Sequence, residues 1–270
     1  MVEAGEVSGN LDTIMLRMAE HFEKENKIEN KVKSSMIYPM VLGIATVAVV
    51  VFMLIFVMPT FVGMFEGSGT ELPGPTQALI NLSNSLQTYW YIYIAAVAAI
   101  VLGISTYKKS KDGTRFFDSL KLKIPIVKGT TTMLVTSRFT RTLSTLMASG
   151  IPLIQALEVV SRVVNNSVIE EKLLTGIENI RKGVTLSRTV KDVGVFPPMV
   201  DSMIKIGEES GSLDEMLYKT ADFYDEEVET SMQKLTSMLE PLMIIVMALI
   251  IGFIVIAMYL PMFDLSSTVQ

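Results

Sequence analysis

The chain repeats itself at a fixed offset of 202 residues. Residues 5–12 read Gly-Glu-Val-Ser-Gly-Asn-Leu-Asp, and residues 207–214 read Gly-Glu-Glu-Ser-Gly-Ser-Leu-Asp. In each copy a glycine turn is followed by a charged helical stretch and then by an apolar run with proline at both ends. A repeat of such length means that one structural unit is used twice. The positions that mark the copies are Gly5, Gly9, Asp12, Pro39 and Pro59 in the first, and Gly207, Gly211, Leu213, Glu240, Pro241 and Pro261 in the second.

Three apolar runs are long enough to cross a bilayer, which needs roughly 20 such residues. They cover residues 37–58, 89–107 and 242–260, and none of them contains a charged residue. Half of the chain is apolar, 19% is charged and the mean hydropathy is +0.44. Buried helices of a water-soluble core would be an unusual source of this pattern. The sequence therefore predicts an all-α polytopic membrane protein with three transmembrane helices.

The charges that flank these runs predict their orientation. Lysines precede the first run, and a basic stretch, residues 108–128, follows the second. Residues 59–88 and 261–270 contain neither lysine nor arginine. Because positively charged flanks stay in the cytoplasm, we expect residues 1–36 and 108–240 to be cytoplasmic. The loop between the first two runs and the C-terminus then lie outside the inner membrane.

The four matched prolines stand at the ends of the first and third runs. Pro39 and Pro241 lie in the first turn of their runs, where a helix has no partner for the missing N–H. We expect Pro59 and Pro261 to stop the helices, although a hinge role is also open. Glu240 directly precedes Pro241 and either stabilises the helix N-terminus through its dipole or contacts a partner.

The outer loop, residues 59–88, contains a cluster of glycine and proline that is typical of turns. Thr76 follows this cluster and is predicted to cap a short helix, residues 77–86. Apolar residues recur in that helix at helical spacing, and we expect the resulting stripe to lie against the membrane face. The stripe consists of Ala78, Leu79, Leu82 and Leu86.

Residues 108–240 have helical periodicity and no convincing strand pattern. We predict a compact bundle of six helices there. The expected helices cover residues 138–149, 151–164, 167–181 and 185–193, then one from 196 to about 207–211 and one from 212 onward. The last continues towards the third run, as a helix from residue 10 continues towards the first. Ser212 and Glu215 form a predicted capping box at its start.

Acidic residues concentrate between residues 207 and 229, where nine carboxylates accompany one lysine. Such a run is usually a solvated helix face. Its place along the helix that enters the membrane makes it our candidate surface for a partner. The candidate residues are Glu208, Glu209, Asp214, Glu215 and Glu226. The basic stretch after the second run suits lipid headgroups instead.

The sequence contains no motif for catalysis, for a metal or for a cofactor. With no cysteine and only one histidine, His21, the chain lacks thiolate sites and a matching set of metal ligands. A Walker phosphate loop, a Gly-x-Ser-x-Gly elbow and a His-Glu-x-x-His helix are all missing. Glu208 and Glu209 point about 100° apart on a helix, so they do not form an acid–base pair. The net charge of −5 disfavours nucleic acid as a partner.

Several motifs together resemble those of the type II secretion F family. They are Phe-Thr-Arg-Thr-Leu-Ser-Thr-Leu-Met-Ala-Ser-Gly-Ile-Pro-Leu at 139–153, Ala156-Leu157, Gly183, Phe196-Pro197, Ile-Gly-Glu-Glu-Ser-Gly-Ser-Leu-Asp at 206–214, Leu-Glu-Pro at 239–241 and Leu-Pro-Met-Phe at 260–263. The resemblance covers nearly the whole chain. It implies two similar helical cytoplasmic domains and three membrane spans.

The same resemblance implies a function without chemistry. Proteins of this family are inner-membrane platforms that couple a cytoplasmic hexameric ATPase to pilin or pseudopilin subunits, which move into or out of a filament. Contacts with other inner-membrane assembly proteins and self-association are implied as well. Whether the filament is a pilus or a secretion pseudopilus stays open.

The repeat also predicts a difference from the family. The helix that starts near Arg138 would have its counterpart 202 residues earlier, before Met1. We therefore expect an N-terminal truncation, with residues 1–36 as the remnant of a first cytoplasmic domain.

Two other hypotheses compete with a platform. A transporter or channel component is the first, because repeats and proline-flanked helices occur in such proteins. The lack of charged residues in the three runs disfavours an ion path. A membrane signalling relay is the second, and no ligand-binding or catalytic signature supports it.

Overall fold

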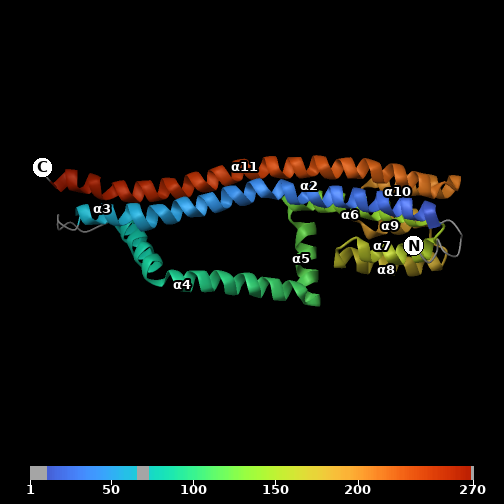
Figure 1. Cartoon of the computed structure of the whole chain (residues 1–270), viewed down its shortest axis with the longest axis horizontal. Helices are drawn as coiled ribbons and strands as arrows, with labels where there is room; N and C mark the ends of the chain where they lie inside the picture. The colour runs from blue at the N-terminus through green and yellow to red at the C-terminus, as the bar shows by residue number, and fades with distance from the viewer. Residues whose placement is uncertain (1–10, 66–72, 269–270) are drawn as a thin grey trace. The chain divides into compact units, whose positions relative to one another are not determined.

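The computed structural model describes residues 11–65 and 73–268, and these residues form helices and no strand. Figure 1 shows the helices along the chain. They are α2 (Leu11–Phe52), the π-helix η1 (Met53–Val57), α3 (Met58–Phe65), α4 (Gly74–Lys109), α5 (Lys111–Lys123), α6 (Pro125–Ala148), α7 (Leu153–Val163), α8 (Ser167–Arg181), α9 (Leu186–Val193), α10 (Pro198–Ser210) and α11 (Leu213–Thr268). The predicted all-α fold is confirmed. Gly5 and Gly9 of the repeat lie outside the described residues.

The chain forms two compact units, each built from two stretches of sequence. The first, here called the bundle unit, comprises Met1–Ser35 and Tyr107–Leu235. The second, the membrane unit, comprises Met36–Thr106 and Thr236–Gln270. Helices α2 and α11 contribute to both units without interruption, so the continuous helices predicted for the two repeat copies are confirmed. The predicted domain boundaries stay predictions.

Helices α6 to α11 supply the core of the bundle unit. Their apolar residues recur three and four positions apart and meet in one cluster. Phe139 and Leu143 of α6 and Val190 of α9 are fully buried in it. The ring of Phe139 lies 4.7 Å from that of Phe196, centroid to centroid. This burial of one face per helix explains why the periodicity of the sequence located these helices.

The helix limits differ from the predicted ones at several points. α8 has the predicted limits, whereas α6 begins at Pro125 and not near residue 138. α5 was not predicted, because most of its residues are charged or polar, and the six-helix bundle is therefore not confirmed. At the start of α11 the hydroxyl of Ser212 lies 2.6 Å from that of Ser210, and the capping box stays a prediction.

The glycines of the second repeat mark a tight junction between α10 and α11. Gly211 ends α10 with a φ of 70°, a conformation that glycine adopts at little cost. Gly207 lies against the start of α11, where an added Cβ would stand 2.8 Å from the Cα of Leu213. Side chains cannot approach a backbone so closely, so only glycine fits at position 207.

Within the bundle unit, the first part of α2 packs along α11 and α6. Ile28 of α2 is buried in a small cluster with Val228 and Met232 of α11. Met133 and Leu134 of α6 adjoin the same cluster. The equivalent stretches of the two repeat copies therefore lie side by side.

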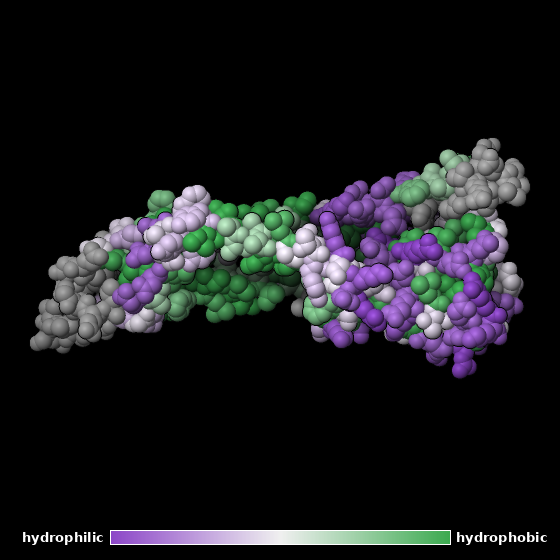
Figure 2. Space-filling view, turned by 90° about the horizontal axis from the view of Figure 1, so that it is seen from below, coloured by the Kyte–Doolittle hydropathy of each residue, from purple (hydrophilic) through white to green (hydrophobic). Residues whose placement is uncertain are grey.

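Three helices are long and apolar enough to cross a membrane, in the stretches Met18–Gly63, Gly74–Lys109 and Leu213–Pro261. Figure 2 shows that hydrophobic residues cover much of the membrane unit, whereas hydrophilic residues dominate the bundle unit. The three predicted spans are confirmed as candidate membrane helices by length and composition. Their orientation stays a prediction.

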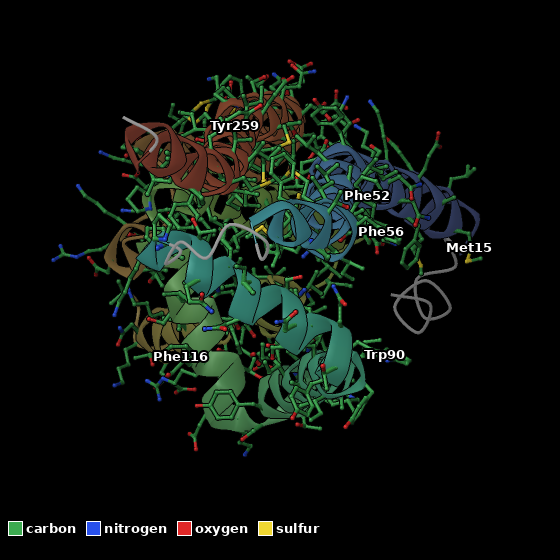
Figure 3. The ribbon with its side chains drawn as sticks, turned by 90° about the vertical axis from the view of Figure 1, so that its left-hand side faces the viewer. Met15, Phe52, Phe56, Trp90, Phe116 and Tyr259 are labelled. Atoms are coloured by element: carbon green, nitrogen blue, oxygen red, sulfur yellow. The ribbon has the colours of Figure 1, made fainter. Side chains whose placement is uncertain are left out.

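In the membrane unit, α2 and α11 run side by side in the same direction. The hydroxyl of Tyr38 donates a hydrogen bond to Glu240 at 3.1 Å. About two helical turns further on, the hydroxyl of Thr46 lies 3.6 Å from the sulfur of Met247. Phe52, at the end of α2, stacks on Phe56 of η1 with ring centroids 5.2 Å apart, and both rings face outward (Figure 3).

Helix α4 has two parts, which meet at Tyr89. This residue has a φ of −115° and a ψ of 24°, outside the helical region, and Figure 1 shows the resulting bend. Before the bend, Leu79 and Ile80 are buried against η1, α3 and α11. After it, residues 89–106 are exposed, and Trp90 projects away from the other helices (Figure 3).

The prolines do not start and stop helices as predicted, and the hinge role stays a prediction. Pro39 and Pro241 lie inside α2 and α11, far from the first turn, and α11 continues through Pro261. Pro59 is the second residue of α3 and does not end a helix. The prediction was wrong because the charged stretches and the apolar runs form continuous helices. A proline in such a helix removes an internal hydrogen bond.

The role predicted for Thr76 was also wrong. α4 begins at Gly74, and the hydroxyl of Thr76 donates to the carbonyl of Ala257 in α11 instead of capping its own helix. In the predicted apolar stripe Leu79 is buried, but Ala78 and Leu82 are exposed. The buried face of the helix is thus turned from the predicted one, towards the polar contacts made by Thr76.

Candidate partner interface

A buried arginine, Arg141, joins three helices of the bundle unit. Its Nη2 donates to Asp222 Oδ1 at 2.5 Å and to Asp225 Oδ2 at 2.6 Å, both on α11. Asp222 Oδ1 also accepts a hydrogen bond from Lys24 Nζ of α2 at 2.6 Å. The ring of Tyr218 lies about as close to both cations, 5.1 Å from the Arg141 guanidinium and 5.3 Å from the Lys24 ammonium. One carboxylate is therefore shared between cations of two different helices.

The charged side chains of this cluster stabilise one another in their ionised forms. Burial works to raise the pKa of Asp222, but the hydrogen bonds from Lys24 and Arg141 outweigh it and lower that pKa. Burial works in the same way against the charged forms of Arg141 and Lys24, and the contacts with Asp222 raise the pKa of both. Asp222, Arg141 and Lys24 therefore stay charged at neutral pH.

A cavity of about 450 Å³ opens beside the cluster, between α2, α6 and α11. Two of the candidate interface residues, Asp214 and Glu215, line it together with Glu20 of α2. Glu215 pairs with Lys219 at 2.7 Å, and both side chains are more than half exposed. Lys24 and Arg141 line the cavity as well, so both signs of charge meet there.

Glu208 is engaged inside the bundle unit. Its carboxylate accepts hydrogen bonds from the backbone N–H groups of Leu186 at 2.6 Å and Ser187 at 3.2 Å, and from the Ser187 hydroxyl at 2.6 Å. These N–H groups belong to the first turn of α9, where a helix lacks internal acceptors and favours negative charge. Glu208 therefore stabilises the start of α9. Its predicted contact with a partner stays a prediction.

The other candidates lie on the surface. Glu209 is exposed and stands 3.8 Å from Lys205, a neighbour on α10. Glu226 is exposed on α11. The structure thus brings Asp214 and Glu215 together at one cavity, while Glu209 and Glu226 do not line it. As interface residues all of them remain predictions.

Sequence reasoning missed a second carboxylate that caps a helix, Asp118 of α5. This buried side chain accepts hydrogen bonds from the N–H of Ser167 at 2.9 Å and from its hydroxyl at 3.1 Å, at the start of α8. Burial works to raise the pKa of Asp118, but the bonds from Ser167 and Lys121 prevail and lower it. Only the tertiary contact between α5 and α8 distinguishes this acid, so no sequence signal could have found it.

The bundle unit offers no site for a metal in the part of the chain that the structure describes. Among residues 11–65 and 73–268, no three His, Asp or Glu side chains gather closely enough to hold an ion.

Comparison with known proteins places the chain in a family. The family model described as Type II secretion system (T2SS), protein F matches residues 1–59 and 139–261. The chain belongs to this family. The matched segments contain both repeat copies, the Arg141 cluster and the cavity residues of α11. Helix α5 lies between them, as does α4.

Named relatives of this T2SS protein F family member fall into two groups. The type IV pilus assembly protein PilC of Myxococcus xanthus is 37% identical over 267 residues, which are 99% of this chain and 64% of the relative. PilC of Pseudomonas aeruginosa is 38% identical over 270 residues, 100% of this chain and 72% of the relative. The type II secretion system protein F of Aeromonas hydrophila is 33% identical over 272 residues, 100% of this chain and 70% of the relative. The chain thus spans about two thirds of the length of these relatives.

Proposed function

We propose that the chain acts as an inner-membrane platform protein of a type IV pilus or type II secretion machine. In this role it couples a cytoplasmic assembly ATPase to the insertion of pilin or pseudopilin subunits into a filament, or to their removal. The observation that carries the proposal is the family match across both repeat copies, together with three helices apolar enough to span a membrane.

The flanking charges support a cytoplasmic bundle unit in this proposal. The N-terminus and residues 108–240 face the ATPase, and the C-terminus lies outside. The partners are the hexameric ATPase, the pilin or pseudopilin, other inner-membrane assembly proteins, a second copy of the chain and the lipid bilayer. The chain itself contributes no catalytic group, and energy comes from the ATPase.

Two features of the structure fit such a coupling role. Helices α2 and α11 pass without interruption from the bundle unit into the membrane unit, so a load on the bundle is transmitted along their backbones. The Arg141 cluster ties both helices to α6 by shared charges. Force applied to α6 therefore acts on both helices at once.

The proposal is tested by isolating the full chain in lipid nanodiscs and measuring its binding to the assembly ATPase of the same organism. Binding is expected for the wild type. Asp214→Lys together with Glu226→Lys should weaken it at least about tenfold if the acidic surface is the contact. Glu208 is left unchanged because its reversal would disturb α9. Asp192→Lys, on the exposed side of α9, removes one carboxylate elsewhere in the bundle and serves as the control.

The outcomes separate the function from the site. No ATPase binding by the wild type would contradict the platform role. Equal binding by the wild type and the double variant would contradict only the acidic surface.

A transporter or channel component remains the alternative function. The two repeat copies run in the same direction in the membrane unit, and no charged residue lies in the predicted spans. Inverted repeats and polar groups at membrane depth are the usual marks of secondary transporters. Specific solute uptake by liposomes that contain the chain would favour this alternative over the platform.

A further inference from the structure

We infer that residues 74–88 of α4 form a strap that fixes the position of α2 along α11 in the membrane unit. Pro59 and Pro261 mark the two places where the strap binds. The inference concerns the fold of the membrane unit and does not depend on the proposed function.

Few backbone carbonyl groups of a helix are free to bind a neighbouring helix. Each carbonyl in an α-helix accepts the N–H four residues later, so a neighbouring helix finds few free acceptors along it. Proline has no N–H and leaves the carbonyl four positions earlier without its helical partner. Pro261 frees the carbonyl of Ala257 in this way, and Pro59 frees that of Ile55.

Both freed carbonyls receive a hydrogen bond from the strap. The hydroxyl of Thr76 donates to the carbonyl of Ala257. The side-chain amide of Gln87 donates to the carbonyl of Ile55 at 3.3 Å. The two prolines that correspond in the repeat are thus matched by two donors at opposite ends of one short helical stretch.

The π-helix supplies a third acceptor. In η1 the N–H of Met58 bonds to the carbonyl of Met53, so it no longer serves Leu54. The next residue is Pro59, which has no N–H to offer. The hydroxyl of Ser83 donates to the carbonyl of Leu54 and fills this place. All three strap donors therefore bind carbonyls that proline or the π-turn has released.

The donors share one face of the strap with its buried apolar residues. Thr76, Ser83 and Gln87 are separated by seven and four positions, which places them on the same side of a helix. Leu79 and Ile80 lie among them and are buried in the cluster that η1, α3 and α11 form. The strap consequently fits in one position only. If α2 or α11 slid by one turn, the strap donors would face carbonyls that already accept a hydrogen bond within their own helix.

The test uses hydrogen–deuterium exchange of the full chain in lipid nanodiscs. Pro59→Ala and Pro261→Ala restore an N–H, which competes with the strap for its acceptors. Amides of residues 74–88 are expected to exchange about five- to tenfold faster in both variants, the range that one hydrogen bond supplies. The matched controls are Pro39→Ala and Pro241→Ala, at the other ends of the same spans, where replacing a helix-interior proline should leave exchange of the strap unchanged or slow it.

A second set of variants removes the donors and leaves the helices intact. Thr76→Val and Ser83→Ala should accelerate exchange in residues 74–88 by a similar factor. Ser85→Ala is the control, because the hydroxyl of Ser85 lies 3.0 Å from that of Tyr93, a hydrogen bond within α4 and not to α2 or α11. The inference is overturned if the donor variants exchange like Ser85→Ala, or if Pro59→Ala and Pro261→Ala behave like their proline controls.

Discussion

Tyr38 and Glu240 hold the same position in the two copies of the repeat, and the hydroxyl of Tyr38 donates a hydrogen bond to the Glu240 carboxylate at 3.1 Å. Residues related by a repeat meet only near the axis that relates the copies. In the membrane unit α2 and α11 are therefore paired around a local twofold-like axis parallel to both helices. Pro39 and Pro241, each the next residue, stand at the same level on either side of it.

This pairing predicts a specific cross-link. The native chain has no cysteine, so Tyr38→Cys with Glu240→Cys places two thiols at chosen positions without interference. A short bismaleimide should link them efficiently and change the mobility of the chain on a denaturing gel. Tyr38→Cys with Met238→Cys is the control, since Met238 is exposed and lies about 200° away from Glu240 around the helix. Equal cross-linking of both pairs would contradict the register.

Replacing Arg141 should destabilise the bundle unit. Arg141→Met leaves Asp225, which is largely buried, without its cation, while Asp222 keeps Lys24. We expect a loss of about 2–3 kcal/mol in the free energy of unfolding. The measurement is denaturant unfolding in detergent, followed by circular dichroism. Arg181→Met removes an exposed arginine that pairs with Glu158 and should cost less than about 1 kcal/mol. Similar losses for both variants would show that burial of the Arg141 cluster does not matter.

Acid should weaken the bundle unit through its lowered carboxyl pKa values. Asp118 and Asp222 have lower pKa values when folded, so the unfolded chain binds more protons in acid. Their contribution is complete above the unfolded pKa of about 3.9 and is lost as the pH falls through the folded values. The thermal midpoint should fall steeply below about pH 4. Asp118→Asn should flatten this fall, and Asp192→Asn should leave it as in the wild type. A midpoint that does not change between neutral and strongly acidic pH would speak against the assignment.

The neighbouring residues Glu208 and Glu209 should respond differently to substitution by glutamine. Glu208→Gln keeps the shape of the side chain but removes the charge that caps α9, and about 1 kcal/mol of stability should be lost. Glu209→Gln, one residue later and exposed, should change stability by less than about 0.5 kcal/mol. Denaturant unfolding of both variants gives the comparison. Amide exchange in residues 186–189 should rise only for Glu208→Gln, and a rise for both would refute the capping role.

Periodicity and length predicted most of the helices because burial of one helix face leaves a direct trace in the sequence. Phe139 and Leu143 lie four residues apart and are both fully buried, in keeping with the helical periodicity of residues 108–240. The long uncharged runs identified the candidate spans for the same reason. α5 escaped notice because its charged residues serve contacts such as that of Asp118, and not an apolar face.

The candidate surface was harder to predict, because a carboxylate in a sequence does not reveal its partner. Glu208 and Glu209 are identical in type and adjacent, yet only Glu208 reaches the start of α9. The roles predicted for the prolines were wrong for a related reason. Pro39 and Pro241 stand near the start of an apolar run, yet the helices that carry them begin at Leu11 and Leu213, so each missing N–H falls in a helix interior.

The π-helix gives the duplicated segments different rotational phases. Both copies have the same number of residues from proline to proline, yet η1 is wound as a π-turn, while its counterpart, residues 255–259, belongs to α-helical α11. A π-turn contains about one residue more than an α-turn, so the side chains that follow it are rotated by about 100° around the helix axis. The aligned residues Met58 and Leu260, which directly follow, therefore point in different directions, and Met58 is buried while Leu260 is 36% exposed. Without an insertion or deletion between them, the two copies thus differ in winding from Met53 onward. A chimera that exchanged the outer ends of the two copies would conserve its length and still present the wrong side chains to its neighbours.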